Sequence, residues 1–540
     1  MIRFLVLAVV AVAAAQPVLS DTPRSQTLTF VSSVDASEQP YALYLPKSFE
    51  PGKKYPVVIS LHSEDSNHRL SLLQVLGQTS RAAEGGRFSL LYAHPLPDID
   101  FIVACPLARG AMGYTGIAET DVYDLLADLQ RRFPVDEDRV YLTGVSMGGA
   151  GALRLALTRP DVWAAVAPVC PGPVPEVSAL APNALNLPVR LFQGEQDPVT
   201  PVASSRLWQR RLLDVGVAAD YLEYPAVRHN AWDFAYKDGG VFNWFGQFRR
   251  NRYPRRVRFV TESYRYASAY WVRVDALTPG TEASIDARQS SDGGVQVETH
   301  DLEGFTLSPD GPVTTVTIDG AAIRVKPGSL SFHRQAGRWM TGRAAPSGKR
   351  PGSEGPIAAA VSERHIYVYG TAGDPTAAEL DFRRQTAETA ARWSSPRESL
   401  QLSFPVKADS TVTGQDLDSA SLVLFGTRET NSLIARFADR LPLALSVGAA
   451  DYGLLFIADV GKHYALVSSG LPWWTGFEDA GRPVDPYVPA RYAELATFGD
   501  YLVFKGSLAH VVVEGRFDRE WKLPADAAAK IAATGTVTVK

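Results

Sequence analysis

Ser146 lies at the centre of a G-x-S-x-G pattern at residues 144–148, between an apolar run at 139–145 and a helical pattern that follows. Such a strand–turn–helix elbow exposes a serine hydroxyl at its apex. We expect glycine at both ends of the turn because a Cβ there would collide with the neighbouring strand or helix. A serine hydroxyl is a poor nucleophile at neutral pH. Acyl transfer would therefore need a base that takes its proton and an acid that orients this base.

His229 is the candidate base. The sequence has nine histidines, and only His229 follows Ser146 within the region where strand and helix patterns alternate. It comes shortly after a predicted strand at residues 219–224, which is where the base belongs in this kind of site. The alternative interpretation is a histidine in a surface loop.

Asp197 is the predicted acid, with the role of fixing the tautomer of the histidine and stabilising the imidazolium. It follows a predicted strand at residues 189–193, in a loop that two prolines stiffen. Glu195 and Asp233 are the alternatives, and either could instead be a solvated loop charge.

Two backbone N–H groups are the predicted oxyanion donors. Met147 N–H opens the helix after Ser146, where the helix N-terminus adds partial positive charge. The second donor is expected in the loop after the third strand, from Ser63 or its neighbour Glu64. We interpret the adjacent His62 as a residue that shapes this loop and not as a catalyst.

These side chains need a scaffold, and the sequence predicts the α/β class with a doubly wound, mostly parallel sheet. In such sheets the chemistry lies at the carboxyl ends of the strands. The predicted strands are residues 27–34, 41–45, 56–62, 101–106, 139–145, 164–169, 189–193 and 219–224, with helical patterns at 120–133 and 204–215 among others.

The chain of 540 residues is too long for one core, and its patterns divide it into several parts. Residues 25–250 carry the alternating patterns of the catalytic domain. Residues 257–340 show short strands separated by Asp, Gly and Pro turns, which predicts a β-sandwich-like module. Residues 341–356 are rich in Gly, Pro, Ser and charge and predict a linker or loop, and residues 357–540 return to an α/β pattern of unknown function.

The N-terminus predicts export. Residues 1–20 combine a short basic start, an apolar run and small residues, as in a secretory signal peptide, so we expect a secreted or periplasmic protein with no membrane association after cleavage. A formal net charge of −4 gives no reason to expect a nucleic acid partner. The two cysteines, Cys105 and Cys170, fall at the ends of non-adjacent predicted strands. We interpret them as buried free thiols, with a disulfide as the alternative.

With these residues placed, about 200 residues of the chain resemble secreted bacterial α/β-hydrolases, namely the catalytic domain of the prolyl oligopeptidase family and polyhydroxybutyrate-depolymerase-type esterases. The resemblance implies Ser146 as nucleophile, Asp197 as acid and His229 as base. Two segments depart from the family pattern: Leu61-His62-Ser63 stands where Leu-His-Gly is usual, and Gln193-Gly194 where His-Gly is usual.

The resemblance implies a serine hydrolase that forms an acyl-enzyme. No β-propeller like that of the oligopeptidases precedes the first predicted strand, which favours a carboxylic ester as the substrate. This ester could be linked to a polysaccharide or lie within a polyester. The alternatives are a peptidase acting on short peptides and a binding protein with a degenerate hydrolase domain. Trp232, Trp473 and Trp474 could stack on sugars, although we favour a packing role for them.

No cofactor or metal is expected. The turn at residues 370–373 lacks a G-x-G-x-x-G pattern and a Walker lysine, and the sequence has neither an H-E-x-x-H motif nor paired cysteines with zinc-ligand spacing.

Overall fold

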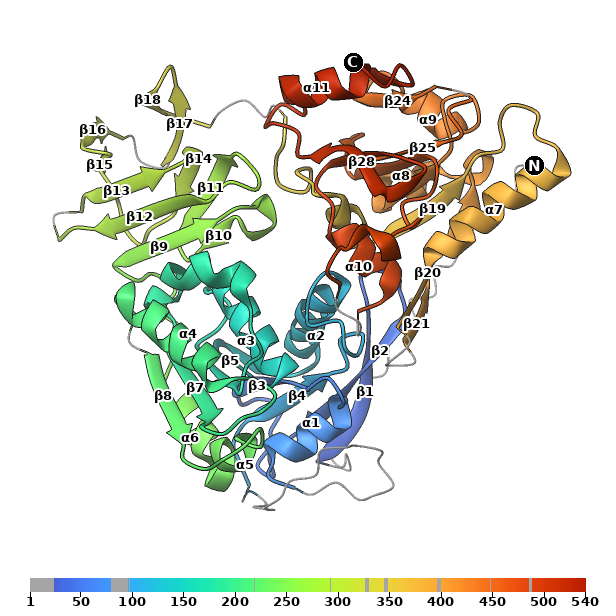
Figure 1. Ribbon diagram of the computed structural model, residues 1–540. Helices are drawn as coiled ribbons and strands as arrows, with labels where there is room; N and C mark the ends of the chain where they lie inside the picture. Colours follow the sequence, from blue (N-terminus) through green and yellow to red (C-terminus); the bar gives the residue numbers. More distant parts are fainter. Residues whose placement is uncertain are drawn as a thin grey trace, which may run out of the picture.

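The computed structural model describes residues 24–78, 96, 98–217, 219–291, 293–325, 330–343, 348–395, 400–446, 448–484 and 488–540. The predicted signal segment, residues 1–20, lies outside these ranges. The described residues form three bodies that follow one another along the chain, coloured blue to green, light green, and orange to red in Figure 1. No helix in the described ranges is both long and apolar enough to cross a membrane.

The first body is built on an eight-stranded sheet with the order β1-β2-β4-β3-β5-β6-β7-β8. The β1–β2 and β2–β4 pairs are antiparallel, and the remaining neighbours are parallel. This confirms the predicted doubly wound, mostly parallel sheet. The strands are β1 (Ser25–Val31), β2 (Glu38–Tyr44), β3 (Tyr55–Leu61), β4 (Ile102–Pro106), β5 (Val135–Val145), β6 (Ala165–Val169), β7 (Val189–Gly194) and β8 (Ala219–Tyr224).

Helices cover both faces of this sheet because its central strands are apolar on both sides. In β3, Val57 and Ile59 face one hydrophobic core while Val58 faces another. The first core also takes side chains from α2 (Ile117–Arg132), α3 (Met147–Thr158) and α4 (Val202–Asp214). The second takes side chains from α1 (His68–Val75), α5 (Trp232–Ala235) and α6 (Gly240–Phe245). Two 3-10 helices, η3 (Pro175–Asn186) and η4 (Lys237–Gly239), complete this body.

The second body is a sandwich of two five-stranded sheets, ordered β10-β11-β14-β17-β18 and β16-β15-β13-β12-β9. Apolar side chains from both sheets, among them Phe259, Ile285 and Phe305, form one core. The elements are β9 (Arg256–Thr261), η5 (Tyr264–Tyr266), β10 (Ser268–Ala269), β11 (Val272–Leu277), β12 (Ala283–Gln289), β13 (Val295–His300), β14 (Leu302–Leu307), β15 (Thr315–Ile318), β16 (Ala321–Arg324), β17 (Ser331–Gln335) and β18 (Arg338–Thr341).

The third body has a seven-stranded mixed sheet with the order β22-β19-β23-β26-β25-β27-β28. Its strands are β19 (His365–Tyr369), β22 (Val406–Ala408), β23 (Ser421–Phe425), β25 (Tyr452–Asp459), β26 (Tyr464–Gly470), β27 (Tyr501–Lys505) and β28 (Ser507–Gly515). The pairs β20 (Arg392–Ser395) with β21 (Leu400–Ser403) and β24 (Leu443–Leu445) with β29 (Val537–Val539) lie apart from it. The helices are η6 (Ile357–Val361), α7 (Ala377–Ala391), η7 (Asp409–Thr411), α8 (Gly414–Ser419), α9 (Ser432–Phe437), η8 (Glu478–Ala480), α10 (Ala490–Ala496) and α11 (Ala525–Ala532).

The stretch predicted as a linker, residues 341–356, is held in place by buried charges. Beyond β18 its described part forms no helix, and its only pairing is the isolated bridge between Arg350 and Ser353. Nevertheless Lys349 forms a buried ion pair with Asp500 of the third body. Glu354 is buried as well and accepts hydrogen bonds from the second body. Composition alone predicted a loop, whereas these contacts make it a fixed connection.

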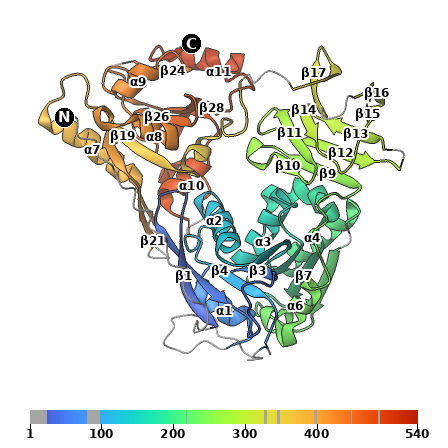
Figure 2. The same cartoon turned by 180° about the vertical axis from the view of Figure 1, so that it is seen from behind.

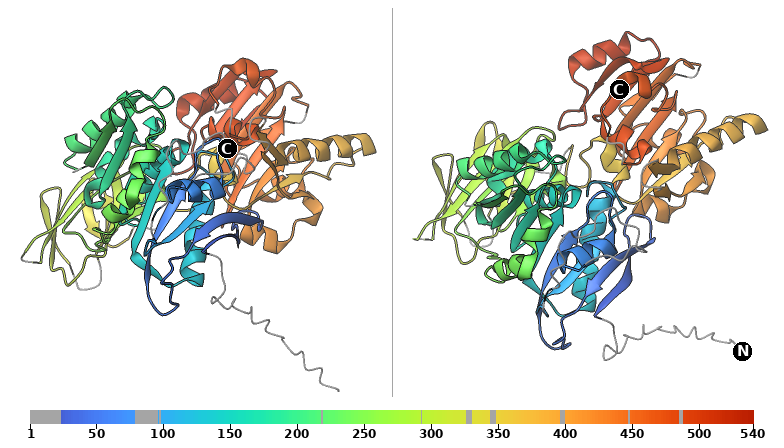
Figure 3. Two further views of the ribbon diagram at one scale, coloured as in Figure 1. Left: turned by 90° about the horizontal axis from the view of Figure 1, so that it is seen from below. Right: turned by 60° about the horizontal axis from the view of Figure 1, so that its bottom comes forward.

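The second and third bodies both pack against the face of the first body that carries α2, α3 and α4 (Figures 1, 2 and 3). A single apolar cluster continues from α2 residues such as Val122 into third-body residues such as Tyr367 and Trp473. Polar contacts cross the same boundary, since Thr120 Oγ1 donates to Ser362 O at 3.3 Å.

Candidate active site

Ser146 occupies the turn between β5 and α3 with a positive φ, at φ 56° and ψ −114°. A residue other than glycine rarely adopts a positive φ, so the backbone holds the nucleophile under strain. A Cβ on Gly144 would overlap Gly148 O, and a Cβ on Gly148 would overlap Leu61 O. The glycines at both ends of the pattern are therefore required by close backbone approach, as the sequence predicted.

The structure brings Ser146, Asp197 and His229 together in one hydrogen-bonded chain. His229 Nε2 lies 3.1 Å from Ser146 Oγ, and His229 Nδ1 lies 2.8 Å from Asp197 Oδ2. The loops that carry the acid and the base are joined by the backbone, because Gln196 N donates to Val227 O at 2.9 Å. The arrangement has the order nucleophile, base and orienting acid, in hydrogen-bond reach at each step.

Asp197 is positioned by donors on both of its carboxylate oxygens. Its Oδ1 accepts from Val199 N at 2.8 Å and Thr200 N at 2.9 Å, and its Oδ2 accepts from Thr200 Oγ1 at 2.8 Å. Burial by itself would raise the pKa of Asp197, but hydrogen bonds from His229 and Thr200 outweigh it and lower this pKa below the usual 3.8. The carboxylate is thus ionised at neutral pH. It accepts a hydrogen bond from Nδ1–H of His229, which leaves Nε2 free to accept one from the hydroxyl of Ser146.

Gln193 is a functional candidate that the sequence analysis missed. Its buried side chain donates to Asp197 Oδ2 at 3.0 Å and to Thr200 O at 3.0 Å, and accepts from Ser205 Oγ at 2.8 Å. The sequence identified this position only as a departure from the family's usual histidine. The available signal was a polar side chain near the end of the strand, four residues before the acid.

The two alternative acids lie elsewhere. Glu195 is exposed, and its carboxylate accepts from Ala226 N at 3.0 Å, so it ties two loops together. Asp233 is buried at the start of α5, where it accepts from Asn230 Nδ2 at 3.0 Å. It is Asp197, and neither of these residues, that contacts His229 Nδ1.

The predicted oxyanion donors belong to loops that follow two paired strands. In the β3–β5 pairing Leu61 stands opposite Gly144, so Ser63 and Met147 follow at the same edge of the sheet. Met147 begins α3, and first-turn N–H groups have no partner inside the helix. Ser63 is not among the described residues with positive φ, so serine fits where the family has glycine.

His62 and Tyr114 hold the loop that contains Ser63. The ring of His62 contacts Ser63 O through Nδ1 at 2.7 Å and Leu107 O through Nε2 at 2.9 Å. Burial lowers the pKa of His62, so the ring is neutral and donates to one of these carbonyl groups at a time. Tyr114 Oη donates to His62 O at 3.0 Å. These contacts agree with a role of His62 in loop shape.

Cys170 lies beside the triad, and its sulfur is within 4.8 Å of the ligand-type atoms of Asp197 and His229. This spacing would suit a metal ion, but burial and the charge of Asp197 raise the pKa of the Cys170 thiol well above its usual value. A neutral thiol is a poor ligand, because metals bind the thiolate. Cys170 and Cys105 are both buried and unpaired, and β3 and β5 separate their strands in the sheet.

The three tryptophans considered for sugar stacking are packing residues. Trp232 is buried and meets the ring of His229 edge to face, with 5.5 Å between the ring centroids. Trp473 is fully buried, and it packs against Trp474, which in turn stacks under the guanidinium of Arg491.

Residues 118–232, which include all three triad residues, match the family model described as "Putative esterase". This chain is 30% identical over 122 residues to Cutinase 1 of Thermobifida cellulosilytica, covering 22% of this chain and 45% of that protein. It is 33% identical over 118 residues to the poly(3-hydroxyoctanoate) depolymerase of Pseudomonas fluorescens, covering 21% and 41%.

The chain spans less than half the length of these curated relatives. The solved structure of a thermostable esterase aligns with a TM-score of 0.33 at 22% identity, covering 42% of this chain and 64% of that one.

Proposed function

We propose that the protein is a serine hydrolase that cleaves carboxylic esters through an acyl-enzyme. The observation that carries this proposal is the continuous hydrogen-bonded chain from Ser146 through His229 to the ionised Asp197, on a strained elbow. The match to an esterase family over the same residues supports esters as the substrate class.

Each step uses groups already in position. Ser146 Oγ attacks the ester carbonyl carbon while His229 Nε2 takes the hydroxyl proton, and the N–H groups of Met147 and Ser63 stabilise the oxyanion. His229 then gives this proton to the leaving alcohol, and the acyl group stays on Ser146. Water, deprotonated by His229, attacks the acyl-enzyme and releases the acid. Asp197 stabilises the imidazolium in both halves.

The relatives narrow the substrate further. A cutinase and a poly(3-hydroxyoctanoate) depolymerase are among them, which supports an ester within a polyester as the substrate. Export, from a signal segment at residues 1–20, is part of the same proposal because these residues combine a basic start, an apolar run and small residues. Mass spectrometry of the mature N-terminus in the culture medium tests it. Finding an intact residue 1 inside cells would contradict it.

The function is tested with p-nitrophenyl esters from acetate to octanoate beside aminoacyl-p-nitroanilides. Ser146→Ala serves as the reference. We expect ester turnover without amide turnover, and a loss of at least about 10³-fold in kcat in Ser146→Ala. Comparable amide turnover would make the protein a peptidase. No turnover, together with no fluorophosphonate labelling of Ser146, would leave the binding-protein alternative.

The acid assignment has a matched test. Asp197→Asn keeps the shape of the side chain but removes its charge, so we expect kcat to fall by about 10³-fold or more, as in other triads with the wrong histidine tautomer. Glu195→Gln makes the same chemical change two residues away in an exposed position and should leave kcat near wild type. A loss of kcat in Glu195→Gln without a loss in Asp197→Asn would show that Glu195 is the acid of the triad.

A further inference from the structure

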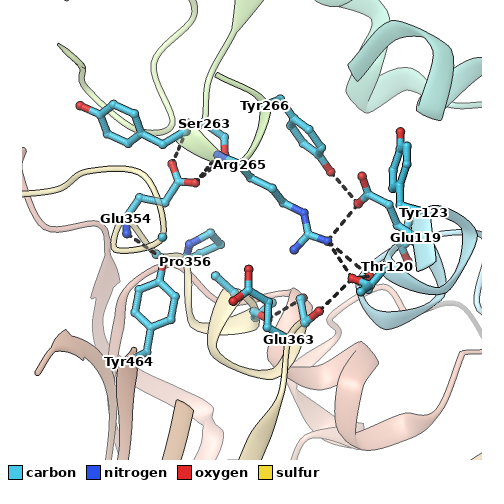
Figure 4. Close-up of a pocket in the computed structure, with 18 of the residues that line it drawn as sticks. Glu119, Thr120, Tyr123, Ser263, Arg265, Tyr266, Glu354, Pro356, Glu363 and Tyr464 are labelled. Carbon is cyan, nitrogen blue, oxygen red and sulfur yellow. Dashed lines mark hydrogen bonds and ion pairs between the residues drawn. The ribbon is translucent and has the colours of Figure 1, made fainter. Parts of the chain in front are cut away.

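A cavity of about 750 Å³ lies where the three bodies meet. It is bordered by α2 of the hydrolase body, by η5 of the sandwich, and by residues 352–364 with Tyr464 and Tyr492 of the third body (Figure 4). Its volume is in the range of about 300–1,000 Å³ found for small-molecule sites.

This junction cavity is distinct from the triad. None of the three triad residues is part of its lining. Arg154 of α3 does line it, eight residues after Ser146. At 1.5 Å per helical residue this places the cavity about 12 Å along the helix from the nucleophile.

Arg265 is the central cation of the junction cavity, and its charge is already compensated. Its backbone N–H donates to Glu354 Oε1 at 2.7 Å, which fixes the start of the side chain. Its Nη2 lies 3.2 Å from Glu119 Oε2 and 3.4 Å from Gly116 O. In Figure 4 the guanidinium reaches into the cavity between Glu119 and Glu363. An anionic ligand would therefore meet carboxylates as well as this cation.

Four buried polar atoms on the lining have no hydrogen-bond partner among the residues that the structure describes. They are Glu119 Oε1, Tyr123 Oη, Arg154 Nε and Arg265 Nε. Glu119 itself is only 2% exposed. Buried polar groups in native proteins are nearly always paired, so something in the cavity must supply their partners.

The unpaired atoms specify the chemistry of that partner. Glu119 Oε1 needs a donor, the two Nε–H groups need acceptors, and the Tyr123 hydroxyl can take either role. A hydroxyl group can both donate and accept, and a sugar carries several of them at fixed spacing. The rings of Tyr266, Tyr464 and Tyr492 add apolar faces to the lining. We propose that the junction cavity binds a small uncharged saccharide, of one or two sugar units.

Tyr123→Phe is the sharpest variant because it removes one unpaired hydroxyl and leaves the free protein otherwise unchanged. Glu119→Gln exchanges the acceptor for an amide, and Glu195→Gln is the matched control on an exposed glutamate outside the cavity. Binding of glucose, xylose and cellobiose to the full chain is measured by titration calorimetry, with phosphate and glycylglycine as charged probes. Calorimetry measures the binding of the sugar and not its turnover, so the result is independent of the proposed hydrolysis.

We expect at least one of the sugars to bind at concentrations up to about 50 mM, which saturates a site with a Kd near 1 mM. Tyr123→Phe and Glu119→Gln should weaken this binding about tenfold or more, and Glu195→Gln should not change it. The proposal is overturned if none of the sugars binds, if only phosphate or glycylglycine binds, or if sugar binding is the same in Tyr123→Phe as in wild type. Tyr123→Phe alone decides the outcome if Glu119→Gln fails to fold.

Discussion

Gln193 donates a hydrogen bond to Asp197 Oδ2 at 3.0 Å, and this is the same carboxylate oxygen that faces His229 Nδ1. The glutamine thus adds a neutral donor where the related hydrolases usually have a histidine. A neutral amide has no titration of its own near pH 7, so it orients the acid in the same way over a wide pH range.

Gln193→Leu should lower kcat about tenfold with little change in KM. A hydrogen bond to a charged acceptor is worth about 1.5 kcal/mol or more, and about 1.4 kcal/mol corresponds to a factor of ten in rate. Steady-state kinetics on a p-nitrophenyl ester measures the two parameters separately. Gln193→His, which restores a donor, should recover part of kcat. A change confined to KM would show that Gln193 acts on substrate binding and not on Asp197.

Thr200→Val tests the electrostatic state of Asp197 through stability. The hydroxyl of Thr200 helps to lower the pKa of Asp197, so the folded pKa lies below that of the unfolded chain, which is about 3.9. Such a group stabilises the fold above the unfolded pKa, and this contribution is lost as the pH falls through the folded pKa. The free energy of unfolding of Thr200→Val should therefore be lower than that of wild type at pH 7, and the difference should shrink below about pH 4.

Urea unfolding at a series of pH values measures this difference. Thr200→Ser keeps the hydroxyl and is the control, with a stability profile parallel to that of wild type. A difference between Thr200→Val and wild type that stays constant down to pH 3 would mean that packing and not the charge of Asp197 is responsible.

Sequence reasoning could anticipate the triad because each candidate follows a strand of the same parallel sheet. Ser146, Asp197 and His229 come after β5, β7 and β8, and the carboxyl ends of parallel strands meet at one edge. The partners of Gln193 could not be anticipated, because they depend on how the loop after β7 turns back over the strand.

The connection at residues 341–356 shows a second limit. Its described part forms no helix, but Glu354 accepts hydrogen bonds from Ser263 and Tyr264, 91 and 90 residues earlier. A local sequence pattern cannot predict a contact between residues that lie so far apart in the chain. The junction cavity likewise depends on how three separately patterned bodies pack, so nothing in the sequence predicted it.

Gly148→Ala should impair the elbow strongly. An added Cβ would overlap the backbone oxygens of Leu61 and His62, which cannot move without shifting β3 and the loop with Ser63. Overpacking of this kind costs about 1–3 kcal/mol, and a displacement of about 1 Å at a reacting centre costs on the order of 100-fold in rate. Ester kinetics and thermal unfolding measure both effects. Gly52→Ala, where a Cβ meets nothing within 4 Å, is the matched control and should behave as wild type. Equal activity of the two variants would show that the elbow tolerates the side chain.

Lys349→Met should destabilise the protein because it leaves Asp500 buried without its cation. Both side chains of this ion pair are fully buried, and Asp500 Oδ2 also accepts from Phe517 N at 2.9 Å. Breaking a buried pair on one side costs about 3–5 kcal/mol, whereas replacing both partners with apolar residues of similar size is close to neutral. The double variant Lys349→Met with Asp500→Leu should therefore recover most of the free energy of unfolding that Lys349→Met loses. Denaturant unfolding of wild type, Lys349→Met and the double variant measures these free energies of unfolding. A double variant as unstable as Lys349→Met would mean that the pair contributes more than charge neutralisation, through the hydrogen bonds that Lys349 and Asp500 form with Phe517 in the loop after β28.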